Sequence, residues 1–277
     1  MAHQDIAMSN PPPRKPKAVL LGEQTARTYF ANIAHVYRHH FGVIVSCSGL
    51  PYVLPATILT LALINLNPEQ PQPALIAAVF VGLGLGYLGL FLTAAVLSVV
   101  LSDICLGNVP TVKRAFAHVF GKRRLWYVFT TSLLAGMAML LGLILLVIPG
   151  LWVLIRSLFA VPVVILEGRR NRDAIRRSFA LTRGQAWRIT GLYLLALLVG
   201  FLIGILVGVP FGIATGIATV VAGPQSTLAR FLPLLAQVSS FILSLPASMM
   251  TVILLYYDQR VRRESYDAQA LSEDLMR

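Results

Sequence analysis

The sequence predicts an all-α polytopic membrane protein, with six transmembrane helices arranged as three hairpins, each preceded by an amphipathic interfacial helix. Three observations lead to this class. Of the 277 residues, 57% are apolar and only 12% are charged, whereas soluble domains carry about 25% charged residues. The mean hydropathy is +0.75. The apolar residues form runs that reach the roughly 20 residues needed to cross a bilayer. A soluble fold and a mainly disordered chain are therefore excluded.

The chain divides into a membrane domain with a polar segment at each end. Residues 1–22 combine three consecutive prolines with a basic cluster and lack the apolar core of a signal peptide. We expect this segment to be a disordered basic tail. The membrane domain is predicted over 23–263, and 264–277 is predicted to be a cytoplasmic C-terminal tail.

The apolar runs predict six spans and the connections between them. Pro149 and Gly150 predict a tight turn between the third and fourth spans. The apolar character of the fifth span continues past Pro210, too far for one upright helix, so we expect a break there. The piece 211–222 would then be either re-entrant or an external helix. The predicted spans are about 41–66, 74–101, 125–148, 151–167, 188–209 and 230–257.

Basic residues are concentrated on one side of these spans. The net charge is +12, and the loops 102–124 and 168–187 and both chain ends hold nearly all Lys and Arg. The opposite side has Arg230 and little else. By the positive-inside rule, both termini of this six-span chain face the cytoplasm, and we expect a bacterial inner membrane. This distribution argues against a nucleic-acid partner, which would require a basic soluble face.

Three similar units follow one another along the chain. Residues 34–37 (Ala-His-Val-Tyr) resemble 117–120 (Ala-His-Val-Phe), and 113–117 (Lys-Arg-Ala-Phe-Ala) resemble 176–180 (Arg-Arg-Ser-Phe-Ala). Each match lies on a basic amphipathic stretch just before a hairpin. Such stretches are typical of helices that lie in the membrane interface.

A carboxylate stands near the end of each predicted hairpin. We hypothesise that Asp103, Glu167 and Asp258 form a pseudo-threefold ring at the cytoplasmic interface, paired with the basic residues that follow each of them. The alternative is that these are ordinary charges of membrane-surface loops. The basic residues that follow are Lys113, Arg114, Arg176, Arg177, Arg262 and Arg263.

Arg156 is a charged residue inside the predicted fourth span. An arginine at that depth costs about 2.5–3.5 kcal/mol on insertion scales unless it is paired or reaches the interface. It could contact a lipid headgroup, an anionic solute or an internal carboxylate, or it could snorkel to the outer interface. Arg176, Arg177 and Arg183 are further candidates for contacts with anionic lipid headgroups.

Small residues recur every fourth position in the last two spans. Small residues at this spacing let membrane helices approach closely, so we expect two facing ridges. We interpret them as packing surfaces rather than a channel lining. Contacts within one chain and contacts between chains both fit, so the oligomeric state stays open. The ridges comprise Gly200, Gly204, Gly208, Gly212 and Gly216, and Ser240, Ser244 and Ser248.

Sequence motifs for catalysis or metal binding are lacking. The glycines at 82–89 lie inside an apolar run, not between a strand and a helix as a dinucleotide loop requires. Histidines 35, 39, 40 and 118 have no acidic or cysteine partner beside them, and neither HExxH nor GxSxG occurs. We therefore expect no cofactor, no metal and no catalytic residues.

The most specific residues lie in the second half of the chain. They read Val-Ile-Pro-Gly-Leu at 147–151, Val-Pro-Val-Val-Ile-Leu-Glu-Gly at 161–168, Asp-Ala-Ile-Arg-Arg-Ser at 173–178 and Leu-Tyr-Tyr-Asp-Gln-Arg-Val-Arg at 255–262. This pattern resembles the bacterial glycerophosphoryl diester phosphodiesterase membrane-domain family. The resemblance extends over roughly residues 25–265.

The resemblance implies a membrane module rather than an enzyme. In some members of that family a soluble phosphodiesterase barrel follows the membrane domain. A barrel takes about 250 residues, which the segment after the sixth span cannot hold. We expect a non-catalytic module that acts as a scaffold or contacts anionic lipids or a protein partner. The alternative is a small transporter or lipid-handling protein with Arg156 in its pathway.

Overall fold

The computed structural model describes residues 26–65, 72–224 and 226–276, and within these ranges the chain is helical apart from short connections. The predicted tail at 1–22 lies outside the described residues. The helices are α1 (Ala26–His39), α2 (Phe41–Asn65), α3 (Pro73–Cys105), α4 (Val112–Phe120), α5 (Arg124–Leu145), α6 (Val147–Ser157), α7 (Ala160–Leu166), α8 (Asn171–Thr182), α9 (Ala186–Ala222), α10 (Thr227–Glu264) and α11 (Ala268–Met276).

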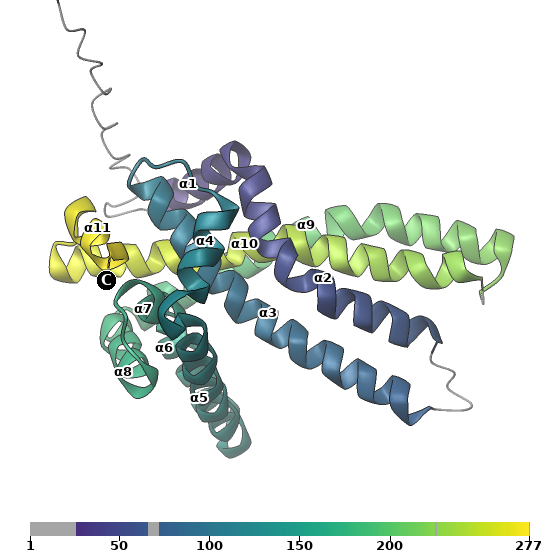
Figure 1. Ribbon diagram of the computed structural model, residues 1–277, viewed down its shortest axis with the longest axis horizontal. Helices are drawn as coiled ribbons and strands as arrows, with labels where there is room; N and C mark the ends of the chain where they lie inside the picture. Colours follow the sequence, from purple (N-terminus) through teal and green to yellow (C-terminus); the bar gives the residue numbers. More distant parts are fainter. Residues whose placement is uncertain (1–25, 66–71, 225, 277) are drawn as a thin grey trace, which may run out of the picture.

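Six helical segments of the described chain are long and apolar enough to cross a membrane, which confirms the predicted all-α class with six spans. They are α2, α3, α5, α6 together with α7, α9 and α10. Helix α2 packs on α3, α5 on α6, and α9 on α10. In Figure 1 these three pairs diverge from a common end, where α1, α4, α7 and α11 gather.

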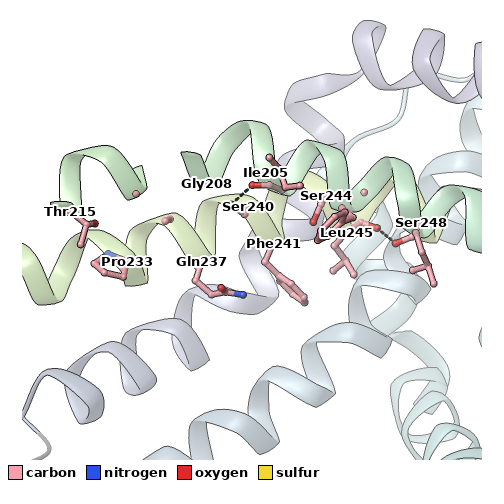
Figure 2. Close-up of a pocket in the computed structure, with 16 residues that line it drawn as sticks. Ile205, Gly208, Thr215, Pro233, Gln237, Ser240, Phe241, Ser244, Leu245 and Ser248 are labelled. Atoms are coloured by element: carbon pink, nitrogen blue, oxygen red, sulfur yellow. Dashed lines mark hydrogen bonds between the residues drawn. The ribbon is translucent and has the colours of Figure 1, made fainter. Parts of the chain in front are cut away.

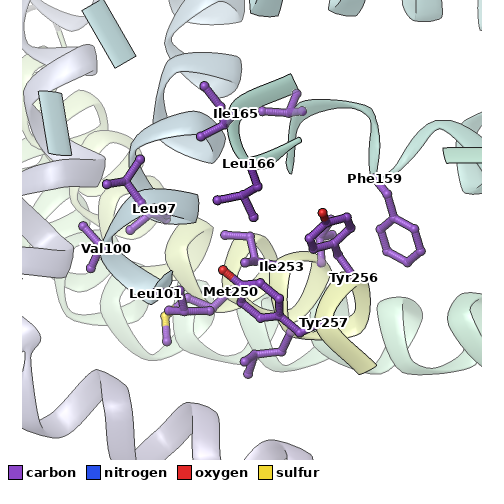
Figure 3. Packing of buried hydrophobic residues seen from close by; sticks show 14 of the residues in the cluster. Leu97, Val100, Leu101, Phe159, Ile165, Leu166, Met250, Ile253, Tyr256 and Tyr257 are labelled. Atoms are coloured by element: carbon purple, nitrogen blue, oxygen red, sulfur yellow. The ribbon is translucent and has the colours of Figure 1, made fainter. Parts of the chain in front are cut away.

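The common end holds the buried core, which we call the hub. It is formed mainly by 95–105 of α3, by Phe159 and the following helix α7, and by 250–257 of α10. Figure 3 shows side chains of all three segments packed together. The far ends of the helix pairs instead expose apolar side chains such as Ile144 and Val220. That is the arrangement expected where lipid, rather than water, surrounds the helices.

The turn between α5 and α6 lies at Leu146, so the predicted turn at Pro149 and Gly150 is wrong. Leu146 is extended, with φ −164° and ψ 149°, and α6 begins at the next residue. Pro149 falls within the first turn of α6, where backbone N–H groups have no partner inside the helix. Proline is tolerated there because the missing N–H is not needed.

The predicted fourth span at 151–167 is two helices rather than one. Helix α6 ends at Ser157 and α7 begins at Ala160. The hydroxyl of Ser178 in α8 bridges this break, because it donates to the carbonyl of Arg156 (2.5 Å) and accepts from the N–H of Phe159 (3.2 Å). One buried side chain thus satisfies two backbone groups that the break leaves unpaired.

We expect Ser178→Ala to lower the free energy of unfolding by about 1–3 kcal/mol, the cost of leaving buried polar groups unsatisfied. The measurement is thermal unfolding of the purified protein in detergent. Ser272→Ala is the control, since that hydroxyl bonds only a carbonyl of its own helix. Equal losses in the two variants would contradict the bridging role of Ser178.

Helix α9 continues without interruption through Pro210 to Ala222, so the predicted break is wrong and 211–222 is neither re-entrant nor a separate helix. At about 1.5 Å per residue, its 37 residues span roughly 55 Å. Helix α10 lies alongside it over most of this length (Figure 1). Neighbouring helices allow a proline to persist inside a membrane helix, and Pro246 sits within α10 in the same way.

The segment predicted as a C-terminal tail is packed onto the hub. Helix α11 contacts α3 and α7. Leu271 is fully buried, and Tyr266 in the preceding connection is nearly so. Residues 264–276 are therefore part of the folded domain rather than a segment separate from it.

Candidate functional site

The charged groups of the hub surround Glu167, which directly follows α7 and has a side chain only 7% exposed. Arg177 of α8 donates from Nε to both carboxylate oxygens, at 3.1 and 2.9 Å. Arg169 lies 2.9 Å away, and the hydroxyl of Tyr256 donates to Oε1 at 3.1 Å. Arg260 of α10 is at 3.9 Å. The carboxylate therefore links α7, α8 and α10.

Arg260 connects this network to the C-terminal helix. Its side chain is 11% exposed and bonds Asp274 of α11 at 2.5 Å and Glu264 at 3.0 Å. Its guanidinium also lies 3.7 Å from the ring centre of Tyr266. Burial raises the pKa of the Tyr266 phenol, although Arg260 lowers it. The hydroxyl stays protonated and donates to Asp274 at 2.8 Å.

The other two predicted carboxylates are also buried and paired. Asp258 of α10, 1% exposed, lies 2.5 Å from Arg188 and 3.0 Å from Arg262. Asp103 of α3, equally buried, lies 3.2 Å from Arg114 of α4. Each of the three carboxylates named from the sequence thus contacts an arginine from the basic pair that follows it. That the three form a pseudo-threefold ring remains a prediction.

Several predicted cations lie outside these ion pairs. Within the described residues, the side chains of Lys113, Arg176 and Arg183 have no carboxylate partner. The sequence pattern assigned no role to Arg188 or Arg260, although Arg260 lies within the family-specific motif at 255–262. Arg260 is only two positions from Asp258 in the sequence, and this spacing was the available signal. The spacing does not reveal which helices converge on the hub.

The pKa of Arg177 illustrates how buried charges of the hub are stabilised by ion pairs. Burial alone would lower the pKa of its guanidinium, but hydrogen bonds to Glu264 and Glu167 raise it above the ordinary value. Arg177 is therefore held as a cation between two carboxylates. Its role is to join α8 to α7 and α10, which leaves it less available for the lipid contact predicted from the sequence.

Arg156 lies near the end of α6, beside α8. Its guanidinium carbon is 4.1 Å from the ring centre of Trp152 and 6.0 Å from that of Phe179 in α8. Its Nε is buried and has no hydrogen-bond partner among the described residues. The charge is thus stacked on aromatic faces, an arrangement that stabilises a cation by about 0.5–2 kcal/mol.

Part of the small-residue ridges meets between α9 and α10. A Cβ added at Gly200 would lie 3.5 Å from the carbonyl oxygen of Ser244. Ser240 donates to the carbonyl of Gly204 at 3.3 Å, and Gly208 faces the same hydroxyl. These contacts lie around the middle of the two helices.

Along the same stretch, the two helices also leave an open groove of about 830 Å³, which extends to Gly212 and Thr215 (Figure 2). A Cβ at Gly212 or Gly216 would meet no atom within 4 Å. Gln237 lines the groove too, and in Figure 2 its side chain points away from α9. The two farther glycines therefore do not take part in the close approach.

A second pocket, of about 710 Å³, lies between α5 and α8, and we call it the α5/α8 pocket. Its apolar side is formed by α5, and its charged side by the residues at the start of α8. In the ranges that the structure describes, no group of three metal-ligating side chains occurs. The pocket is lined by Thr130, Leu133, Leu134, Met137, Arg170, Asn171, Arg172, Asp173 and Arg176.

Comparison with known proteins identifies the family of this helical domain. No curated protein and no solved structure matches the chain. Residues 127–273, more than half of the 277-residue chain, match the family model described as the membrane domain of glycerophosphoryl diester phosphodiesterase. This region runs from the start of α5 into α11 and includes Glu167, Arg177 and Arg260. The chain therefore belongs to the glycerophosphoryl diester phosphodiesterase membrane-domain family.

Proposed function

We propose that this protein is a non-catalytic membrane module that gathers anionic lipids, and with them a protein partner, at the basic end of its helices. The observation that carries the proposal is the distribution of charge. Carboxylates of the hub are neutralised by arginines, while Lys113 of α4 and Arg172 and Arg176 of α8 have no carboxylate partner among the described residues. The surplus at this end is therefore positive.

We further propose that the basic end faces the cytoplasm of a bacterium, with the module in the inner membrane. The support is the positive-inside rule applied to the surplus of arginines around the hub. An anionic leaflet would then lie beside the unpaired cations, and each basic residue near such a surface contributes about 1 kcal/mol of attraction.

The geometry around Arg156 favours this module over a transporter. Its guanidinium stacks on Trp152 and lies near Phe179. The hub beside it is filled by apolar side chains. A solute pathway would instead need a polar route to this charge.

The test is the composition of the lipids that surround the protein in nanodiscs made from equal parts of phosphatidylcholine and phosphatidylglycerol. We expect the wild-type chain to retain phosphatidylglycerol preferentially after release into the mass spectrometer. Neutralising Lys113, Arg172, Arg176 and Arg183 together by glutamine should abolish that preference. Equal retention of both lipids by the wild type would contradict the proposal. The purified protein should also leave glycerophosphocholine unhydrolysed.

A further inference from the structure

We propose that the α5/α8 pocket binds the headgroup of one anionic phospholipid, whose acyl chains lie along α5. This inference rests on the proposed function and assigns the lipid contact to one site on the protein. It predicts a discrete site with one lipid bound, where the proposal above requires only a general attraction of the basic end for anionic lipid.

The charge in the pocket supports an anionic ligand. Three arginines, Arg170, Arg172 and Arg176, line it together with one acidic group, Asp173. Arg170 lies over the ring of Tyr127, 4.4 Å from its centre. Among the described residues, Arg172 and Arg176 have neither an ion pair nor a hydrogen bond from their side chains. The surplus charge of the pocket is therefore positive and available.

The two sides of α8 differ in whether their arginines are paired with carboxylates. Arg177 turns toward the hub and is paired with Glu167 and Glu264. Its neighbour Arg176 lines the pocket instead. Since carboxylates are present a few residues away and already neutralise Arg177, the unpaired state of Arg176 reflects its position on the opposite side of the helix.

The other wall of the pocket indicates that the ligand is a lipid rather than a free phosphate ester. Leu133 and Met137 of α5 line it and are 45% and 53% exposed. Helix α5 is one of the helices able to cross a membrane. A small soluble anion would leave these side chains uncovered, whereas an acyl chain would cover them while its phosphate reaches the arginines.

The pocket is held in shape before any ligand binds. Asn171 adopts a positive φ of 45°, a conformation that asparagine tolerates better than most residues. Its Oδ1 accepts a hydrogen bond from Thr130 at 2.7 Å, and its N–H donates to Thr131 at 3.0 Å. The start of α8 is thereby fixed against α5. A preformed site loses less entropy on binding.

The experiment is a titration of the full-length protein in detergent micelles with phosphatidylglycerol, followed by native mass spectrometry. Each basic residue near an anionic group strengthens binding about fivefold. We therefore expect Arg172→Gln/Arg176→Gln to weaken retention of a single bound lipid by about 25-fold. The matched control is Lys113→Gln/Arg183→Gln, which removes the same charge from the basic end outside the pocket and should change retention less than threefold.

Two further variants keep the test independent of folding. Arg172→Lys/Arg176→Lys preserves the charge and should retain the lipid within a few-fold. Leu133→Trp fills the apolar wall without changing charge and should also weaken binding. Circular dichroism checks that each variant remains helical.

The outcomes separate this inference from the proposed function. If both glutamine pairs weaken binding equally, the discrete site is overturned while general attraction to the basic end stands. If neither pair has an effect, both are overturned. If millimolar glycerol 3-phosphate displaces the lipid as well as phosphatidylglycerol does, the ligand is a soluble phosphate ester and the lipid assignment is overturned.

Discussion

Replacing Arg260 by glutamine is expected to lower the free energy of unfolding by about 3–5 kcal/mol, the cost of removing one partner from a buried ion pair. Arg260 contacts Asp274 and Glu264 directly and lies near Glu167. Without the guanidinium, the carboxylate of Asp274 loses its ion pair with Arg260 and keeps the hydrogen bond from the hydroxyl of Tyr266. We therefore expect α11 to detach from the hub before the rest of the domain unfolds.

The measurement is thermal unfolding in detergent, together with limited proteolysis at the C-terminal end. Arg183→Gln is the control, because it removes an arginine that has no carboxylate partner among the described residues. We expect the Arg260 variant to unfold at a clearly lower temperature and to be cleaved first between α10 and α11. Unfolding and cleavage like those of the control would show that the network does not hold α11 in place.

The pairing of the hub was partly predictable from the sequence. A carboxylate near the end of a helix pair, followed by a basic pair on an amphipathic stretch, suggested that the two lie near the same membrane surface. The structure places Arg114 beside Asp103, and Arg177 beside Glu167. These partners are close along the chain, so a short connection is sufficient to bring them together.

The rest of the hub depends on contacts between distant segments. Arg188 reaches Asp258 across 70 positions of the sequence. Tyr256 reaches Glu167 across 89. No periodicity or spacing reveals such contacts, because they are set by how three helix pairs converge. The same holds for α11, whose short amphipathic sequence does not show that it packs against α3 and α7.

The predicted helix boundaries were wrong where local sequence signals and helix packing disagree. Pro210 predicted a break that the neighbouring α10 makes unnecessary. Conversely, the break between α6 and α7 occurs at Leu158 and Phe159, although neither residue is glycine or proline and Pro162 follows only in the first turn of α7. A hydroxyl from α8 satisfies the exposed backbone groups there. In both cases a neighbouring helix decides the outcome, and the local sequence does not.

The turn between α5 and α6 depends on two glycines in contact. A Cβ added at Gly142 would lie 2.9 Å from the Cα of Gly150. A Cβ added at Gly150 would lie 2.4 Å from Cγ and 2.7 Å from the backbone nitrogen of Leu143. A side chain could rotate away, but the backbone of α5 could not yield without moving the helix. The close approach explains why glycine is required at both positions.

We therefore expect Gly150→Ala to lower the free energy of unfolding by about 1–3 kcal/mol, the typical cost of overpacking, and Gly142→Ala to have a similar effect. Gly216→Ala is the matched control, since its added methyl group meets no atom within 4 Å. That substitution should be neutral or slightly stabilising, because alanine favours the helix over glycine. Unfolding in mixed micelles of increasing sodium dodecyl sulfate measures the difference.

The double variant Gly142→Ala/Gly150→Ala makes the test more specific. If the helices separate once to admit either methyl group, the second substitution adds little, and the combined loss is smaller than the sum of the single losses. Strictly additive losses would mean that each glycine matters for its own reason rather than for their mutual contact. Because the control adds the same methyl group to another apolar helix, a difference from it can only arise from the crowding at the α5–α6 turn.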